Sequence, residues 1–199
     1  MLSNNKTQMV KKQQGKLDII MGCMASGKSS EVIRLYRRFK QTYSEKQIGL
    51  ISHATDTRYG NQVISTHDKN QIPCICISTL GDLESEEYQL KYENWEIIFI
   101  EEAQFFSGLK SFVKNAVDIH HKHVIVIGLD GDFQREEFGE ISALIPLADN
   151  YTKLKAICHY CKDGTEAIFT KRITDSKCQT IVGTLDMYKP VCRYHYLHT

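Results

Sequence analysis

"MGCMASGKSS", residues 21–30, follows the apolar run LDIIM at 17–21 and precedes a stretch with helical periodicity. Within it, residues 22–29 fit the pattern G-x-x-x-x-G-K-[ST]. Small residues let backbone N–H groups converge on phosphate oxygens, while the lysine adds positive charge and the serine offers a hydroxyl to Mg²⁺. An ordinary glycine turn is the alternative. The strand before the loop and the helix after it favour a nucleotide-binding loop.

The segments around this loop alternate between two periodicities. Apolar positions on one face predict a helix over 30–43, and a second amphipathic helix follows Ser107. The acidic segment 80–95 also has a helical pattern. Continuous apolar runs predict four further strands, at 47–53, 72–78, 96–100 and 123–129. Strands that are apolar throughout and separated by helices predict an α/β fold, with a parallel sheet flanked by helices.

Length and composition limit the domain organisation. The chain has 199 residues, 42% hydrophobic and 25% charged, which fits one large domain or a domain with a small appendage. We expect a disordered tail over 1–16, a nucleotide-binding domain over 17–150 and a smaller lobe over 151–199, where the alternation ends. A net charge of +1 gives no basic footprint for nucleic acid, and no apolar run is long enough for a membrane span.

Two adjacent acids, Glu101 and Glu102, follow the strand at 96–100. In a parallel sheet, ligands bind at the carboxyl ends of the strands. Because neighbouring strand residues point in opposite directions, one acid can face the phosphates and metal while the other faces a second substrate. A solvated strand end is the alternative interpretation.

Cysteines form two knuckles in the smaller lobe. Cys158 and Cys161 have the spacing C-x₂-C, and Cys192 and His195 have the spacing C-x₂-H. These four residues suit a tetrahedral Zn²⁺ that is structural, because no coordination position stays open. His159 and His198 are alternatives to His195 as the fourth ligand. In the loop, Cys23 lies near a helix N-terminus, which favours a reactive thiolate.

The order of the motifs resembles that of type II thymidine kinases, the cellular and poxviral kind. The resemblance covers about residues 17–197 and rests on short segments in the family's order: GCMASGKSSE, DTRYG at 56–60, THD at 66–68, EEAQFF at 101–106, LDGDFQREEFG at 129–139, CHYC at 158–161, TKR at 170–172 and MYKPVCRYH at 187–195. It implies transfer of phosphate from ATP to the 5′-hydroxyl of thymidine. It also implies a zinc-bearing lobe, a homotetramer and a cytoplasmic enzyme.

The resemblance also implies roles for individual residues. The catalytic residues would be Glu102, Lys28 and Arg58. The residues for ATP and Mg²⁺ would be Gly22, Cys23, Met24, Ala25, Ser26, Gly27, Lys28, Ser29, Asp56, Arg58, Glu101 and Gln104. The thymidine residues would be Met24, Phe105, Leu129, Phe133, Phe138, Gln179, Thr180, Ile181, Val182, Gly183 and Tyr188. Two positions depart from the family: Glu101 replaces the usual aspartate, and Ala25 stands where phenylalanine is common.

Other classes of protein explain fewer motifs. A nucleic-acid-dependent ATPase would use the same loop, but the sequence has no basic groove or series of stacking aromatics. A zinc-ribbon binding module would explain only the last forty residues. We expect ATP and thymidine as partners, with neither nucleic acid nor a membrane. Whether thymidine or DNA stimulates ADP release separates these possibilities.

Overall fold

The computed structural model describes residues 14–55, 63–65, 70–174 and 187–199. A six-stranded sheet forms its centre, in the order β5-β2-β6-β7-β1-β8. Every pair of neighbouring strands in this sheet is parallel, as expected for an α/β protein. The strands are β1 (Lys16–Gly22), β2 (Ile48–His53), β5 (Ile75–Ile77), β6 (Ile97–Glu101), β7 (His123–Gly128) and β8 (Asn150–Leu154).

Two strands differ from the sequence prediction. The single strand expected over 72–78 is wrong, because the segment divides into β4 (Gln71–Pro73) and β5. β4 pairs antiparallel with β3 (Val63–Ser65) in a separate hairpin that ends at Pro73. Proline has no N–H for a central sheet, which accounts for the break. The other difference is β8, which the sequence analysis did not predict; it extends the sheet to residue 154.

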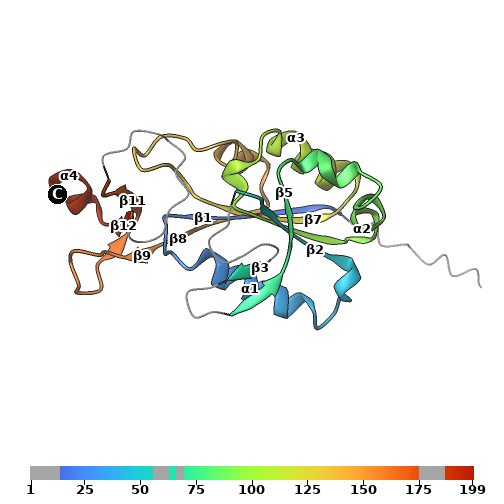
Figure 1. Ribbon diagram of the computed structural model, residues 1–199, viewed down its shortest axis with the longest axis horizontal. Coiled ribbons are helices and arrows are strands. Elements are labelled where there is room, and N and C mark those ends of the chain that lie inside the picture. Colours follow the sequence, from blue (N-terminus) through green and yellow to red (C-terminus); the bar gives the residue numbers. More distant parts are fainter. Residues whose placement is uncertain (1–13, 56–62, 66–69, 175–186) are drawn as a thin grey trace, which may run out of the picture.

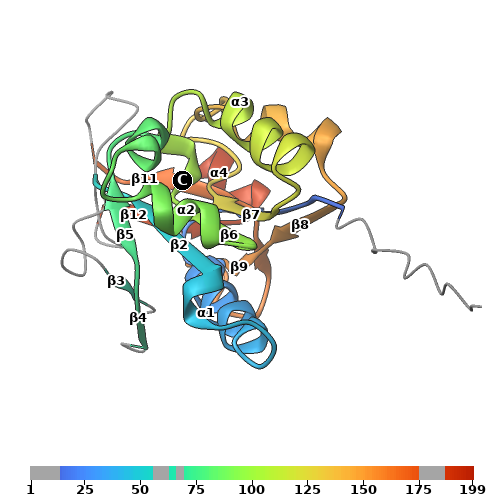
Figure 2. The ribbon, with the colours of Figure 1, turned by 90° about the vertical axis from the view of Figure 1, so that its right-hand side faces the viewer.

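Helices cover both faces of the sheet (Figures 1 and 2). α1 (Lys28–Phe39) lies on one face, and α2 (Gln89–Asn94) and α3 (Leu109–Lys114) lie on the other. α1 begins two residues before the predicted start and ends four residues before the predicted end. α3 continues into a π-helical turn over Asn115–Ile119. Shorter 3₁₀ turns occupy Glu45–Gln47, Leu80–Glu84, Ala103–Phe105 and Ser142–Leu147. Among the described residues, no helix has the length and apolarity needed to cross a membrane.

Alternate residues of the strands fill two separate cores. In β1, Leu17 and Ile19 pack on the α3 side, whereas Ile20 packs with Val32 and Ile33 of α1. The central strand β6 is fully buried along its length. This two-sided burial explains why the central strands read as continuous apolar runs. Because β1, β6 and β7 pair in parallel, their carboxyl ends lie at the same edge of the sheet.

A small lobe follows β8 and lies at one end of the molecule (Figure 1). Its described residues form two antiparallel strand pairs and a short helix. Its elements are β9 (Ala156–Ile157), β10 (Glu166–Ala167), β11 (Phe169–Arg172), β12 (Tyr188–Val191) and α4 (Arg193–His198). Its core contains Cys158, Ala167 and Val191, and also Cys23 from the glycine-containing loop. The lobe therefore packs directly against the segment that follows β1.

Candidate active site

The glycine-containing loop joins β1 to α1, as the sequence predicted. β1 ends at Gly22, and α1 begins at Lys28. The ammonium of Lys28 donates hydrogen bonds to the carbonyl oxygens of Gly22 at 3.0 Å and Cys23 at 2.8 Å. Burial lowers the pKa of Lys28, while the negative charges of Glu102 and Asp130 act in the opposite direction. The side-chain nitrogen of Lys28 thus lies within the loop, where its charged form is favoured by the carboxylates of Glu102, Asp130 and Glu101.

Glu101 and Glu102 lie at the carboxyl end of β6 and contact different partners. Glu101 is 5% exposed, and its Oε1 accepts a 2.7 Å hydrogen bond from the hydroxyl of Ser29. Glu102 leaves the strand in a left-handed backbone conformation, with φ of 52°. Its carboxylate accepts a hydrogen bond from Gln104. The two acids therefore face different groups, as expected, although a backbone turn at Glu102 contributes to their divergence.

Gln104 supports the side chain of Glu102. Its Nε2 donates to Glu102 Oε2 at 2.5 Å, and its Oε1 accepts from the backbone N–H of Leu129 at 3.0 Å. The residue is 3% exposed. Both polar atoms of the amide are thus engaged within the protein. This geometry favours a supporting role for Gln104 over the direct contact with ATP or Mg²⁺ that the resemblance implied.

Two glycines make room for Gln104. A Cβ on Gly128 would lie 2.5 Å from its Oε1, and a Cβ on Gly139 would lie 2.1 Å from its backbone oxygen. Gly139 also has a φ of +63°, in the region that favours glycine. Gly128 and Gly139 are therefore the two points at which the segment 129–138 closes against Gln104.

Several predicted thymidine residues lie in contact with one another. The rings of Phe105 and Phe138 meet edge to face, with centroids 5.4 Å apart. The ring of Phe133 lies under the guanidinium of Arg172, whose Cζ is 3.7 Å from the ring centroid. The hydroxyl of Tyr188 accepts hydrogen bonds from Nε and Nη2 of the same arginine, at 3.1 and 2.5 Å. The structure thus joins Phe133 and Tyr188 through a residue that received no role in the sequence analysis.

Thr170 and Arg172 are site neighbours that the sequence analysis quoted but gave no role. They alternate with half-buried positions in β11 and are 5% and 8% exposed. The hydroxyl of Thr170 accepts a 2.9 Å hydrogen bond from the backbone N–H of Met24. The spacing of two along a strand was the signal that could have placed both residues on one buried face.

The side chain of Cys23 lies in the core of the lobe, which does not suit the reactive thiolate that its position suggested. The thiol is fully buried in the core of the lobe, and its Sγ donates to the carbonyl oxygen of Ala167 at 3.5 Å. Burial raises the pKa of Cys23, so the expectation of a reactive thiolate is wrong. The physical reason is that contact with the lobe removes the side chain from water, which penalises the charged form.

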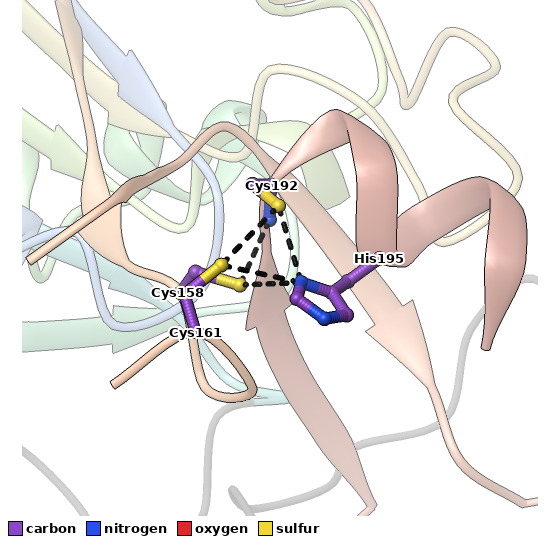
Figure 3. A group of neighbouring side chains, drawn as sticks. All are labelled: Cys158, Cys161, Cys192 and His195. Atoms are coloured by element: carbon purple, nitrogen blue, oxygen red, sulfur yellow. Dashed lines mark hydrogen bonds between the residues drawn. The ribbon is translucent and has the colours of Figure 1, made fainter. Parts of the chain in front are cut away.

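The two cysteine knuckles meet in the lobe (Figure 3). The four candidate ligand atoms, from Cys158, Cys161, Cys192 and His195, all lie within 4.8 Å of one another. Sγ of Cys161 is 3.8 Å from Sγ of Cys192 and 3.3 Å from Nδ1 of His195. Nδ1 of His195 is 3.6 Å from Sγ of Cys158. These separations are close to the edges of a tetrahedron with metal–sulfur bonds of about 2.3 Å, which are about 3.8 Å long.

The alternative histidines lie outside this cluster. His198 Nδ1 is 2.9 Å from the carbonyl oxygen of Tyr194, one turn back in α4. The ring of His159 contacts that of Tyr160. Among the described residues, His195 is the histidine that completes the set with the three cysteines. A three-thiol, one-imidazole donor set is one that Zn²⁺ commonly occupies in structural sites.

Some predicted site residues lie outside the described parts of the chain. They are Asp56, Arg58, Gln179, Thr180, Ile181, Val182 and Gly183. Their roles stay predictions. Residues 1–13 of the tail predicted over 1–16 also lie outside the described parts, and the prediction is wrong at Lys16, which belongs to β1.

A comparison with known families identifies the chain. The thymidine kinase family model matches residues 15–196. The chain belongs to the thymidine kinase family. This match includes the glycine-containing loop, both acids of β6 and the cysteine cluster, and it confirms the resemblance on which the residue roles depend.

Similar proteins come from plants, viruses and animals. The thymidine kinase of Rabbit fibroma virus (strain Kasza) is 41% identical over 183 residues, which cover 92% of this chain and 96% of the viral protein. The thymidine kinase of Oryza sativa subsp. japonica is 39% identical, over 92% of this chain and 66% of the rice protein. A protein of Bos taurus named "Thymidine kinase, cytosolic" is 38% identical, over 93% of this chain and 73% of its own length.

Proposed function

We propose that this member of the family transfers the γ-phosphoryl group of ATP to the 5′-hydroxyl of thymidine. The observation that carries the proposal is the meeting of Ser29 with Glu101 at 2.7 Å, where the loop after β1 reaches the end of β6. The adjacent residue Glu102 has a carboxylate directed to a different partner. The site thus combines a phosphate-binding loop, an acid beside its serine and a second acid for the acceptor.

The loop would hold the triphosphate. Backbone N–H groups over residues 22–29 and the ammonium of Lys28 supply positive charge to the phosphate oxygens. The hydroxyl of Ser29 and the carboxylate of Glu101 are oxygen donors of the kind that Mg²⁺ prefers, so the residues present fit this ion. When bound, Mg²⁺ neutralises charge on the transferring phosphate. Glu101 has one methylene more than the aspartate common in the family. With this longer side chain, its carboxylate still lies within hydrogen-bond distance of the Ser29 hydroxyl, at 2.7 Å.

Glu102 would act as the general base. The 5′-hydroxyl oxygen forms a bond to the γ-phosphorus, the bond from that phosphorus to the β–γ bridging oxygen breaks, and ADP leaves. The hydroxyl proton passes to Glu102 as the new bond forms. Gln104 holds the carboxylate in place for this transfer. Lys28 and, from outside the described residues, Arg58 would stabilise the charge that spreads over the phosphoryl oxygens.

The thymine base would lie among the aromatic residues next to this site. Phe105 and Phe138 contact each other, and Phe133 contacts Arg172, which also binds Tyr188. Met24 of the glycine-containing loop and Tyr188 of β12 would also contact the nucleoside. Because Met24 belongs to the loop that would hold ATP, the two substrates would lie next to each other. The segment 179–183 would supply backbone hydrogen bonds to the base. Such bonds favour thymidine over deoxycytidine, whose exocyclic amine would place a donor against a donor.

The cluster of three cysteines and one histidine would hold a structural Zn²⁺. Zinc supplies fold stability here, because four protein ligands leave no position for substrate. We further propose, from the family resemblance, that the protein is a homotetramer, and from the name of the bovine relative that it acts in the cytoplasm. Thymidine and ATP would be its substrates, with no nucleic acid involved.

An ADP-release assay tests the proposed function. Thymidine should stimulate ADP release, whereas deoxycytidine and single-stranded DNA should stimulate it much less. Glu102→Gln keeps the shape of the side chain but removes its basicity, so kcat should fall by about 10²–10⁴ while the KM for ATP changes only a few-fold. Glu136→Gln, an exposed acid in the segment 129–138, is the matched control and should keep normal turnover. Stimulation by DNA alone, or full activity of Glu102→Gln, would contradict the proposal.

A further inference from the structure

One residue connects the cysteine cluster to the segment proposed to hold thymine. The hydroxyl of Tyr196 donates a 2.8 Å hydrogen bond to the backbone carbonyl oxygen of Phe133. Tyr196 belongs to α4 and directly follows His195, a member of the cluster. The two bonded residues are 63 positions apart in the sequence. This contact therefore joins the lobe to the larger domain at the site itself.

The helix that carries Tyr196 depends on support from outside. α4 has six residues, too few for an isolated helix to be stable in water. Cys192 directly precedes it and His195 lies within it, so the cluster fixes the helix at two points. The N–H of Tyr196 donates to the carbonyl oxygen of Cys192 at 2.9 Å. The place of the tyrosine ring is thus set by the same residues that would bind the metal.

The ring of Tyr196 has a second contact with the same segment. The guanidinium of Arg135 lies over it, with Cζ 4.3 Å from the ring centroid. The ring of Phe169 packs against its side, with centroids 5.2 Å apart. Arg135 is two residues after Phe133, so the segment is held through one backbone carbonyl and one side chain. Asp132 shapes the turn between them by accepting from the N–H groups of Gln134 and Glu136, at 2.8 and 2.9 Å.

We propose that Tyr196 is a positioning residue for the nucleoside. The cysteine–histidine cluster holds Tyr196 in place, and the hydrogen bond from its hydroxyl in turn holds Phe133 in place. The part of this inference in which Phe133 contacts thymine rests on the proposed function. The part in which Tyr196 holds the segment 129–138 in place does not depend on it. A hydrogen bond to the backbone carbonyl of Phe133 limits where the backbone, and with it the side chain, of Phe133 can lie. Tyr196 therefore affects the fit of a pyrimidine nucleoside without contacting the phosphates or the reacting hydroxyl.

Tyr196→Phe tests the inference because it removes one hydroxyl and keeps the ring, its stacking and the arginine contact. The matched control is Tyr194→Phe, on the same helix, where the ring is 65% exposed and contacts His195 and His198. We measure KM for thymidine and for ATP, kcat, zinc content, and hydrogen exchange of the peptide covering 129–138. A second variant, Arg135→Gln, removes the contact between the guanidinium of the exposed Arg135 and the ring of Tyr196.

In Tyr196→Phe the KM for thymidine should rise about 3- to 10-fold, with kcat and the KM for ATP within 2-fold, as loss of one hydrogen bond predicts. Exchange over 129–138 should become faster, and zinc content should match that of the wild type. Arg135→Gln should change both quantities in the same direction, and Tyr194→Phe neither. Unchanged thymidine KM and exchange, equal effects in Tyr194→Phe, or loss of zinc in Tyr196→Phe would overturn the inference. If the wild type does not phosphorylate thymidine, the proposed function fails, while the exchange data still decide whether Tyr196 braces the segment.

Discussion

The amide nitrogen of Gln104 lies 2.5 Å from a carboxylate oxygen of Glu102, and the other end of the same amide accepts the N–H of Leu129. The proposed general base is thus held by a buried side chain that is itself fixed by the backbone after β7. A carboxylate held this way loses less rotamer freedom when the acceptor hydroxyl binds.

The first prediction concerns this pair. Gln104→Glu keeps an acceptor for Leu129 N–H but replaces the donor to Glu102 with a second carboxylate. The repulsion should lower kcat at neutral pH by at least about 10-fold and move the acidic limb of the pH–rate profile to higher pH. Gln104→Leu removes the hydrogen bond without adding a charge, so it should lower kcat and move that limb in the same direction but by less. Equal profiles for the two variants would contradict a direct interaction between Gln104 and Glu102.

Glu101 should determine the requirement for magnesium. Glu101→Gln weakens the ligand set at Ser29, so the Mg²⁺ concentration for half-maximal activity should rise about 10-fold or more, with thymidine KM nearly unchanged. Glu101→Asp, the residue common in the family, should keep a requirement close to that of the wild type. Glu102→Gln is the control and should change kcat instead. A magnesium effect at position 102 and a pure kcat effect at 101 would show that the two roles are reversed.

Cys23 should be protected from alkylation with or without ATP. Its thiol is fully buried and its pKa is raised, so iodoacetamide should label it at least about 10-fold more slowly than the half-buried Cys76. Removal of metal by a chelator should speed the labelling, because Cys158 and Cys192 share a core with Cys23. Mass spectrometry of the labelled peptides measures this. Fast labelling of the untreated protein, suppressed by ATP, would place the thiol in the nucleotide site.

The purified protein should contain one Zn²⁺ per chain. Cys161→Ser and His195→Ala each remove a member of the cluster and should lose most of the metal. His198→Ala is the matched control in the same helix and should keep it. Elemental analysis measures the content, and loss of zinc should be accompanied by a lower melting temperature. Full zinc in His195→Ala would move the fourth ligand to another residue.

Asp18 should make the free energy of unfolding depend on pH in the acidic range. Burial by itself would raise the pKa of this carboxyl, but hydrogen bonds from His123, Lys16 and Asn150 outweigh it and hold the pKa well below its usual range. A lowered folded-state pKa contributes stability above the unfolded value of about 4, and this contribution is lost as the pH falls below it. The free energy of unfolding should therefore decrease from about pH 4 downward.

Asp18→Asn tests this dependence by urea denaturation. The variant should be about 1–3 kcal/mol less stable at pH 7, because charged hydrogen bonds are lost, and its stability should fall less steeply below pH 4. Asp118→Asn changes an exposed acid on the helical turn after α3 and should leave the acid slope as it is. An equally steep acid slope in Asp18→Asn would assign the dependence to other groups.

The sequence predicted the sheet where burial left a strong pattern. The runs at 17–21, 47–53, 96–100 and 123–129 are apolar because their strands are covered on both faces. β8 was missed for the opposite reason: its residues, NYTKL, lie at the edge of the sheet and are mostly exposed. Burial imposes no hydrophobic periodicity on such a strand, so its sequence resembles that of a loop.

The candidate site was predictable in its residue types but not in its contacts. Local spacing identified the glycine-containing loop, the two acids and the cysteine knuckles. Spacing could not indicate that Cys23 enters the core of the lobe or that Tyr196 reaches Phe133, since both contacts join segments far apart in the sequence. The role of Gln104 was similarly hidden, because the partner of its side-chain oxygen, Leu129, follows a different strand, β7.

The closure of Gly128 and Gly139 on Gln104 has a consequence for how the protein can evolve. A Cβ at Gly128 would enter space that the side chain of Gln104 occupies, whereas a Cβ at Gly139 would meet the backbone oxygen of residue 104, which no replacement at 104 removes. A larger residue at 128 is therefore tolerated only when the side chain at 104 becomes smaller, so these two positions change in pairs, whereas position 139 is restricted to glycine whatever residue stands at 104. In a library that varies all three codons together, survivors should show correlated choices: a larger residue at 128 accompanied by a smaller one at 104.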